Sequence, residues 1–121
     1  MVTKNISVKE IECKCNCGLK WVSNGTLLIV QMARDYFGEP VVITSGARCP
    51  SHNAKVGGSE RSQHMPDSND ICHAIDFYIK GKTTKELYDY LDKMFPDSLG
   101  LGLADSFVHI DDRLTKRRWK Y

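Results

Sequence analysis

Two short runs with a two-residue period constrain the fold of this 121-residue chain most strongly. In AIDFYI, residues 74–79, large apolar side chains occupy every second position, and Asp76 falls on the other face. The run FVHID, residues 107–111, places His109 in a second strand-like segment. A period of two is typical of β-strands, whereas helices repeat every 3.6 residues. The sequence therefore predicts a sheet in which two strands carry polar, chemically reactive side chains.

Two helices are expected before the first of these runs. Ser7 and Glu10 stand three residues apart, the capping-box spacing, and predict a short opening helix. A longer helix is predicted over residues 25–37, with Asn24 as its cap and Gly38 at its end. PVVITSG, which follows, is predicted to be a buried strand that ends in a turn.

The clearest helix is predicted over residues 83–95, where Thr83 and Glu86 form a capping box and Pro96 ends the segment. LGLGLA, residues 99–104, reads as a further strand, joined to FVHID by a tight turn. Strands with helices before and between them indicate an α+β fold with a small, mainly antiparallel sheet and flanking helices. The length predicts a single domain over residues 1–121.

Composition excludes several classes of protein. The net charge of +2 is too small to argue for a nucleic-acid partner, and the basic ending RLTKRRWKY is predicted to be solvated surface onto which Trp119 packs. No apolar run approaches membrane-spanning length, and no signal peptide is recognisable near the start. We therefore expect a monomer that is made in the cytoplasm and does not enter a membrane.

The five cysteines do not indicate a complete disulfide framework, because their number is odd. CKCNC, residues 13–17, suggests a metal site, but structural zinc sites usually space paired cysteines two to four residues apart. Cys13 and Cys17 meet that spacing, and Cys15 is then predicted to point away. Reduced, partly buried thiols are the default prediction, with a cysteine-bound metal as the alternative.

A polar stretch of 26 residues separates two of the predicted strands. Residues 47–72 are rich in glycine and serine, with at most one helical turn expected, and so long a loop in a small domain indicates a functional role. It contains His64, which together with Asp76 and His109 offers two imidazoles and a carboxylate, a ligand set that suits catalytic zinc. Spacing alone leaves the alternative open that these are ordinary loop and strand residues.

ITSGARCPSHNAKVGGSERSQHM, followed by AIDF, FVHID and RRW, resembles the zinc D-alanyl-D-alanine carboxypeptidase family, within the wider group of lysostaphin-type and hedgehog-like zinc folds. The resemblance runs from about residue 11 to residue 119, and the cysteine-containing opening shares in it. It implies a hedgehog or DD-peptidase-like zinc fold, one Zn2+ ion held by His64, Asp76 and His109, and peptidoglycan stem peptides as substrates.

The resemblance also implies roles for the residues around the metal. Arg48 is expected to hold a substrate carboxylate or the polarised carbonyl oxygen, because its planar fork binds carboxylates bidentately. The alternative for Arg48 is a surface ion pair. Ser62 and Gln63 are expected to position His64 and to contact substrate, while Gly57 and Gly58 allow a tight turn.

This chain departs from the family pattern in two places. Eleven residues separate His64 from Asp76, so the enlarged segment is either a specificity loop or a shift of His64 away from the metal, with His73 as a competing ligand. Relatives place an acid three residues before the last zinc histidine, where this chain has serine. Asp105 is therefore predicted as the general base, and Asp111 as the partner that orients His109.

The resulting hypothesis is a zinc metallopeptidase that hydrolyses peptidoglycan stem peptides, either as a D-Ala-D-Ala carboxypeptidase or as an L-Ala-D-Glu endopeptidase. It suits a phage or prophage endolysin that acts on the cell wall after release, or a bacterial enzyme that acts there after export. The alternative is a non-catalytic, zinc-containing binding or phage structural module of the same fold.

Overall fold

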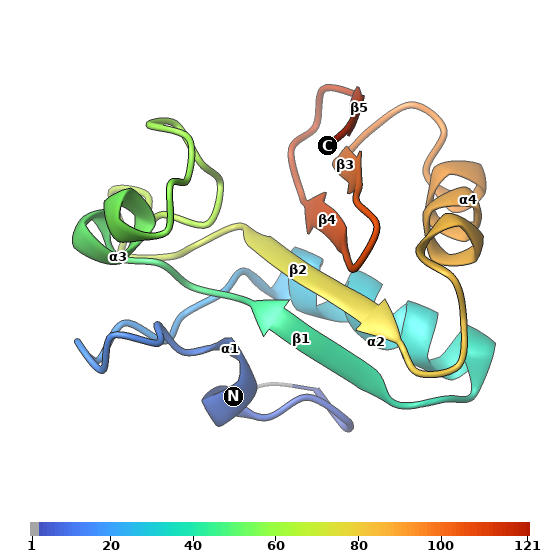
Figure 1. Ribbon diagram of the computed structural model, residues 1–121, viewed down its shortest axis with the longest axis horizontal. Coiled ribbons are helices and arrows are strands. Elements are labelled where there is room, and N and C mark those ends of the chain that lie inside the picture. The colour runs from blue at the N-terminus through green and yellow to red at the C-terminus, as the bar shows by residue number, and fades with distance from the viewer. Residues whose placement is uncertain (1–2) are drawn as a thin grey trace.

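The computed structural model describes residues 3–121, which form one five-stranded sheet with helices packed against it (Figure 1). The strand order is β1-β2-β4-β3-β5. The strands are β1 (Val41–Ser45), β2 (Ala74–Ile79), β3 (Gly100–Leu103), β4 (Val108–Asp111) and β5 (Arg117–Lys120). All neighbours pair antiparallel except β3 and β5, which are parallel. The predicted α+β fold with a mainly antiparallel sheet is confirmed.

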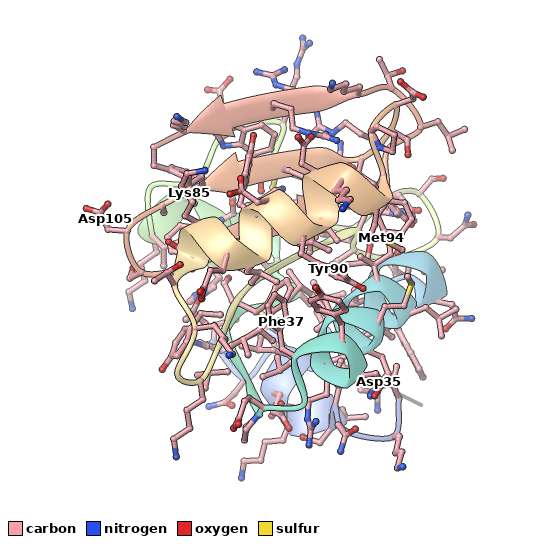
Figure 2. All side chains as sticks on the ribbon, turned by 90° about the vertical axis from the view of Figure 1, so that its right-hand side faces the viewer. Asp35, Phe37, Lys85, Tyr90, Met94 and Asp105 are labelled. Carbon is pink, nitrogen blue, oxygen red and sulfur yellow. The ribbon has the colours of Figure 1, made fainter. Side chains whose placement is uncertain are left out.

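Four helices accompany the sheet: α1 (Val8–Ile11), α2 (Asn24–Phe37), α3 (Pro50–Lys55) and α4 (Thr84–Met94). In Figure 1, α2 passes behind β1 and β2, and α4 lies at the other end of the sheet, beside β3. Phe37 and Tyr90 lie between α2 and α4, with their ring centroids 5.4 Å apart (Figure 2). The core between helices and sheet includes fully buried Val30, Phe77 and Leu91. No helix among residues 3–121 is both long and apolar enough to span a bilayer.

The helix ends follow local capping signals. Both predicted capping boxes are present, at Ser7 before α1 and at Thr83 before α4. The cap predicted for α2 is wrong by one residue: Ser23, not Asn24, has extended backbone and accepts a hydrogen bond from the Thr26 amide. Gly38 ends α2 in the left-handed conformation, with φ of 69°, which a residue with a side chain rarely adopts.

One prediction about the sheet edges is wrong and another is incomplete. β1 is half-buried rather than buried, because it is an edge strand with β2 as its neighbour. Residues 117–120, predicted as solvated surface, do expose Arg117 and Lys120, but they also form the opposite edge strand, β5. Their side chains are too basic to show the alternation of a half-buried strand. Trp119 does pack onto the sheet as predicted, because Gly102 has no side chain: a Cβ there would lie 2.5 Å from Trp119 Nε1.

The register of the strands sets the positions of the reactive side chains. In the β2–β4 ladder, Asp76 pairs with His109, so these two residues lie directly opposite each other. Across β2 on the other side, Ser45 at the end of β1 also pairs with Asp76, after an irregularity in the register. Asp76 therefore lies near the centre of the sheet, flanked by the end of β1 and by His109 of β4.

Candidate functional site

His64, Asp76 and His109 converge at one buried point. One ligand atom from each lies within 4.8 Å of the others. Asp76 Oδ1 is 3.0 Å from His64 Nε2 and 2.9 Å from His109 Nδ1. The sheet register holds Asp76 and His109, whereas His64 enters from the loop that follows α3. The structure thus brings together the three residues predicted to bind metal.

The second nitrogen of each imidazole is held by the protein. His64 Nδ1 lies 2.7 Å from the carbonyl oxygen of Gly46, and His109 Nε2 lies 2.8 Å from Asp111 Oδ2. An N–H donated to each of these acceptors leaves His64 Nε2 and His109 Nδ1 as lone-pair donors. Metal-binding histidines are typically held in this way, through a carbonyl or carboxylate on the far nitrogen.

Proton counting shows that a cation fits between these groups. All four ring nitrogens face an acceptor, yet a neutral imidazole carries one N–H. The two inner ring nitrogens, His64 Nε2 and His109 Nδ1, both face Asp76 Oδ1, where a cation would satisfy all three atoms. Burial acts to lower the pKa of His109, but hydrogen bonds to Asp111 and Asp76 outweigh it and raise that pKa. A divalent ion would replace the protons on the two inner nitrogens, so two imidazoles and a carboxylate fit zinc with one position left open.

Asp111 is the fully buried carboxylate behind His109. Its two oxygens receive a bidentate contact from Arg113, at 2.7 and 2.8 Å, and Oδ1 also accepts from the Gly100 amide. Burial acts to raise the pKa of Asp111, but hydrogen bonds from His109 and Arg113 hold it below its ordinary range. Asp111 therefore stays ionised and makes the contact expected of a residue that orients His109. Arg113 was not singled out from the sequence, because only the fold brings it to Asp111.

The Arg48 side chain contacts residues of the site and does not extend over the open surface. Its Nη2 lies 3.4 Å from Asp76 Oδ2, its Nη1 donates to Asn53 Oδ1 at 3.2 Å, and its Nε donates to Ser45 Oγ at 3.0 Å. A Cβ at Gly58 would lie 2.9 Å from Nη1, so glycine there leaves room for the guanidinium. These contacts do not support the alternative of a surface ion pair. The predicted role toward substrate stays a prediction.

An open cleft of about 1020 Å³, a volume that accommodates a peptide segment, leads from solvent to the side chains of His64, Asp76 and His109. Ser62 and Gln63 both line it. Ser62 Oγ accepts a hydrogen bond from the His64 amide at 3.1 Å, which ties the loop to the ligand it carries. Trp119 of β5 lines the same cleft, with its ring centroid 5.0 Å from that of His109.

The predicted base, Asp105, is exposed in the turn between β3 and β4 and is not among the residues that line the cleft. In Figure 2 its side chain projects outward at the left edge of the molecule. Among residues 3–121, the carboxylates that line the cleft are Asp76 and Glu60. The role of Asp105 therefore stays a prediction, and Glu60 enters as a second candidate that no sequence motif indicated.

The enlarged segment before β2 leaves His64 in place. None of residues 65–75 lines the cleft, whereas residues 56–64 do, so the lining does not support the prediction that the enlarged segment is a specificity loop. His73 is not a competing ligand, because it is not part of the group formed by His64, Asp76 and His109; its two ring nitrogens instead contact Asp112 and Asp67 at 2.9 and 2.7 Å. The segment is also tied down by a bridge between Val22 and Cys72.

We expect His73 to stabilise the fold in a pH window. Burial acts to lower its pKa, but hydrogen bonds to Asp67 and Asp112 outweigh it and raise that pKa; the contact with His73 lowers the pKa of Asp67. The His73 contribution is full below its unfolded pKa of about 6.5 and is lost as pH rises through the folded value. The Asp67 contribution is present above about 4 and is lost at lower pH.

His73→Gln should therefore lower the melting temperature more at about pH 5.5 than at about pH 8.5. Thermal unfolding followed by circular dichroism checks this, with His52→Gln as the matched change in α3. An equal loss at both values would contradict the ion-pair account.

A buried site of two histidines and one aspartate at the floor of an open cleft is typical of mononuclear metalloenzymes, a class that includes the zinc hydrolases. The Peptidase M15 family model matches residues 4–111 of the chain. The chain therefore belongs to the Peptidase M15 family and is a metallopeptidase of the zinc D-Ala-D-Ala carboxypeptidase-like kind, as its motifs predicted. A search of curated proteins finds no match.

Proposed function

We propose that this metallopeptidase hydrolyses stem peptides of bacterial peptidoglycan, either by releasing terminal D-Ala or by cutting between L-Ala and D-Glu. The observation that supports it is the His64–Asp76–His109 centre at the floor of a cleft with arginines in its walls. The lining arginines are Arg48, Arg61, Arg113 and Arg117. Stem peptides carry free carboxylates, which arginine binds through paired hydrogen bonds.

Different residues of the chain have different roles in the proposed hydrolysis. Zinc, when bound, would polarise the scissile carbonyl and lower the pKa of a bound water towards about 7. Asp111 fixes the His109 ring, and the Gly46 carbonyl fixes the His64 ring, so both ligands are oriented before substrate arrives. Arg48 stays charged beside Asp76 and is proposed to stabilise negative charge that develops on the substrate oxygen.

The base that takes a proton from water is proposed to be Asp105, with Glu60 as the alternative that lines the cleft. Asp105→Asn and Glu60→Gln distinguish the two. The variant that lacks the base should lose about 10²- to 10⁴-fold in kcat while keeping its metal, and the other variant should keep near-normal turnover. Steady-state kinetics with metal analysis of both proteins measures this. Normal turnover in both variants would remove both carboxylates from the mechanism.

The decisive experiment for the substrate is mass spectrometry of purified peptidoglycan fragments after incubation with the protein. A chelator should abolish product formation and zinc should restore it. Loss of a single D-Ala identifies a carboxypeptidase, and separation of L-Ala from D-Glu identifies an endopeptidase. Because the same fragments report both bonds, one digest decides between them.

A non-catalytic binding module is the second candidate. It is favoured by Ser106, which stands where relatives carry an acid, and by the outward position of Asp105. The digest tests it directly: protein that contains stoichiometric metal but forms no product would support binding over catalysis.

We further propose that the enzyme reaches the wall after synthesis in the cytoplasm, as a phage or prophage endolysin does. Co-expression with a membrane-permeabilising phage protein should then lyse bacteria, whereas expression of either protein alone should not. A His109→Ala variant is the control for lysis by the permeabilising protein itself. Lysis that persists with this variant would contradict the proposal.

A further inference from the structure

Four cysteines from two distant parts of the chain meet at a second point, outside the cleft. Cys13, Cys15 and Cys17 precede α2, and Cys49 directly precedes α3. Their sulfur atoms all lie within 4.8 Å of one another. The prediction that Cys15 points away is wrong, because its Sγ lies 3.5 Å from Cys13 Sγ and 3.5 Å from Cys49 Sγ. None of the four lines the cleft.

These separations match a metal site better than disulfides. A disulfide brings two sulfurs to about 2.05 Å, and all five cysteines are free thiols in this structure. Four thiolates around one zinc ion at about 2.3 Å form a tetrahedron whose S···S edges are about 3.8 Å. The measured distances of 3.5 Å are close to that edge.

The backbone explains how a C-x-C-x-C run supplies three ligands on one side. In an extended strand the three cysteines would share one face, but successive ones would lie about 6.5 Å apart along the chain, too far for all three to reach one ion. Here Asn16 and Gly18 have left-handed conformations, with φ of 62° and 91°, and the Asn16 amide donates to the Cys13 carbonyl oxygen. The run therefore coils tightly, and its three sulfurs turn toward Cys49.

Backbone amides also point at the sulfurs. The Cys49 amide donates to Cys13 Sγ at 3.4 Å, and the His52 amide, in the first turn of α3, donates to Cys49 Sγ at 3.4 Å. Such N–H···S contacts stabilise the negative charge of thiolate ligands. Buried Cys13 and half-buried Cys49 form the inner side of the cluster, while Cys15 and Cys17 are exposed, so an ion can enter from solvent.

We propose that Cys13, Cys15, Cys17 and Cys49 bind a second metal ion, a structural Zn2+ in a closed tetrahedral thiolate site. Four protein ligands leave no open position, so this ion takes no part in hydrolysis. The proposal is independent of the substrate assigned above, since it rests on a separate group of residues.

The position of the cluster indicates what the ion stabilises. It ties the N-terminal segment to Cys49, next to Arg48, and closes a chain loop of more than 30 residues. The Ala47 amide donates to the Ile11 carbonyl oxygen at 2.8 Å, and a Cβ at Gly46 would lie 2.5 Å from that oxygen. The same Gly46 carbonyl holds His64. The thiolate site therefore holds in place the turn at Gly46, whose carbonyl oxygen supports His64.

Metal analysis of the purified protein tests the proposal. Wild-type protein should contain two zinc equivalents, and the double variant Cys15→Ser/Cys17→Ser should contain one. Both positions are exposed, so the substitutions do not disturb the core. Cys72→Ser, at the fifth cysteine outside the cluster, should still contain two. One equivalent in wild type, or two in the double variant, would overturn the proposal.

Cobalt substitution gives a second readout that does not depend on how the cysteine variant folds. A four-thiolate site loaded with Co2+ should show strong thiolate-to-cobalt charge-transfer absorption in wild type and equally in His64→Ala. Absence of these bands, or an intact mass lower by the hydrogens lost to two disulfides, would overturn it. Amide hydrogen exchange at Ala47 and Arg48 should become faster when the thiolate-bound ion is removed.

Discussion

His64→Ala should remove one metal equivalent per chain and reduce peptide hydrolysis to background. His64 Nε2 is one of the three candidate ligand atoms, and the two that would remain hold a divalent ion poorly. The loss falls mainly on kcat/KM, because no bound ion remains to activate water. Metal content and turnover of a stem peptide are the two measurements.

His52→Ala is the matched control. His52 lies in α3, twelve positions before His64, and does not line the cleft. The variant should keep both the metal and the activity. Full activity in His64→Ala, or metal loss in His52→Ala, would contradict the assignment of the centre. If either variant lost only the zinc equivalent held by the four cysteines, that loss would belong to the second site and not to the catalytic centre.

Asp111→Asn should weaken metal binding or activity by about 10- to 100-fold, the usual cost of losing a carboxylate behind a ligating histidine. The amide keeps the size of the side chain but loses the charge that Arg113 and His109 share. It also presents an N–H to one of these two donors, so one contact becomes repulsive. The free energy of unfolding should fall as well, because Arg113 keeps its charge without its partner.

Asp112→Asn provides the comparison at the neighbouring position. Asp112 contacts Ser23 and His73, not the catalytic centre, so its variant should keep normal metal affinity. Competition with a chromogenic chelator measures the affinity of both proteins. Equal metal affinity in the two variants would show that Asp111 supports the fold and does not orient His109.

Local sequence signals were sufficient for most of the helices and strands. Capping boxes at Ser7 and Thr83 and the glycine at position 38 act within one helical turn, so no distant residue is needed to recognise them. The period of two in β2 is likewise local, because successive side chains of a strand point to opposite faces of the sheet, and Asp76 falls on the face opposite Ile75, Phe77 and Ile79.

The sheet edges and the contacts between distant segments were predicted less well, because they depend on residues far away in the sequence. β5 pairs with β3 through backbone hydrogen bonds, which its basic side chains do not reveal. Glu60 and Arg113 have no motif, and only the folded chain brings them to the cleft. The cysteine cluster shows the same limit: the spacing of residues 13–17 suggested at most two ligands, and Cys49 joins them across more than 30 residues of chain.

For this protein, the residue types and their order determined the α+β class and the family motifs, and through the family resemblance they indicated the three candidate metal ligands. These properties depend on short-range periodicity and on side-chain chemistry, both of which can be read in one dimension. Only the tertiary structure decided that Asp111 and the Gly46 carbonyl orient the two histidines, that Asp105 is exposed and does not line the cleft, and that four thiols converge. Those outcomes depend on strand register and on left-handed backbone at Asn16, which set directions in space that residue spacing does not encode.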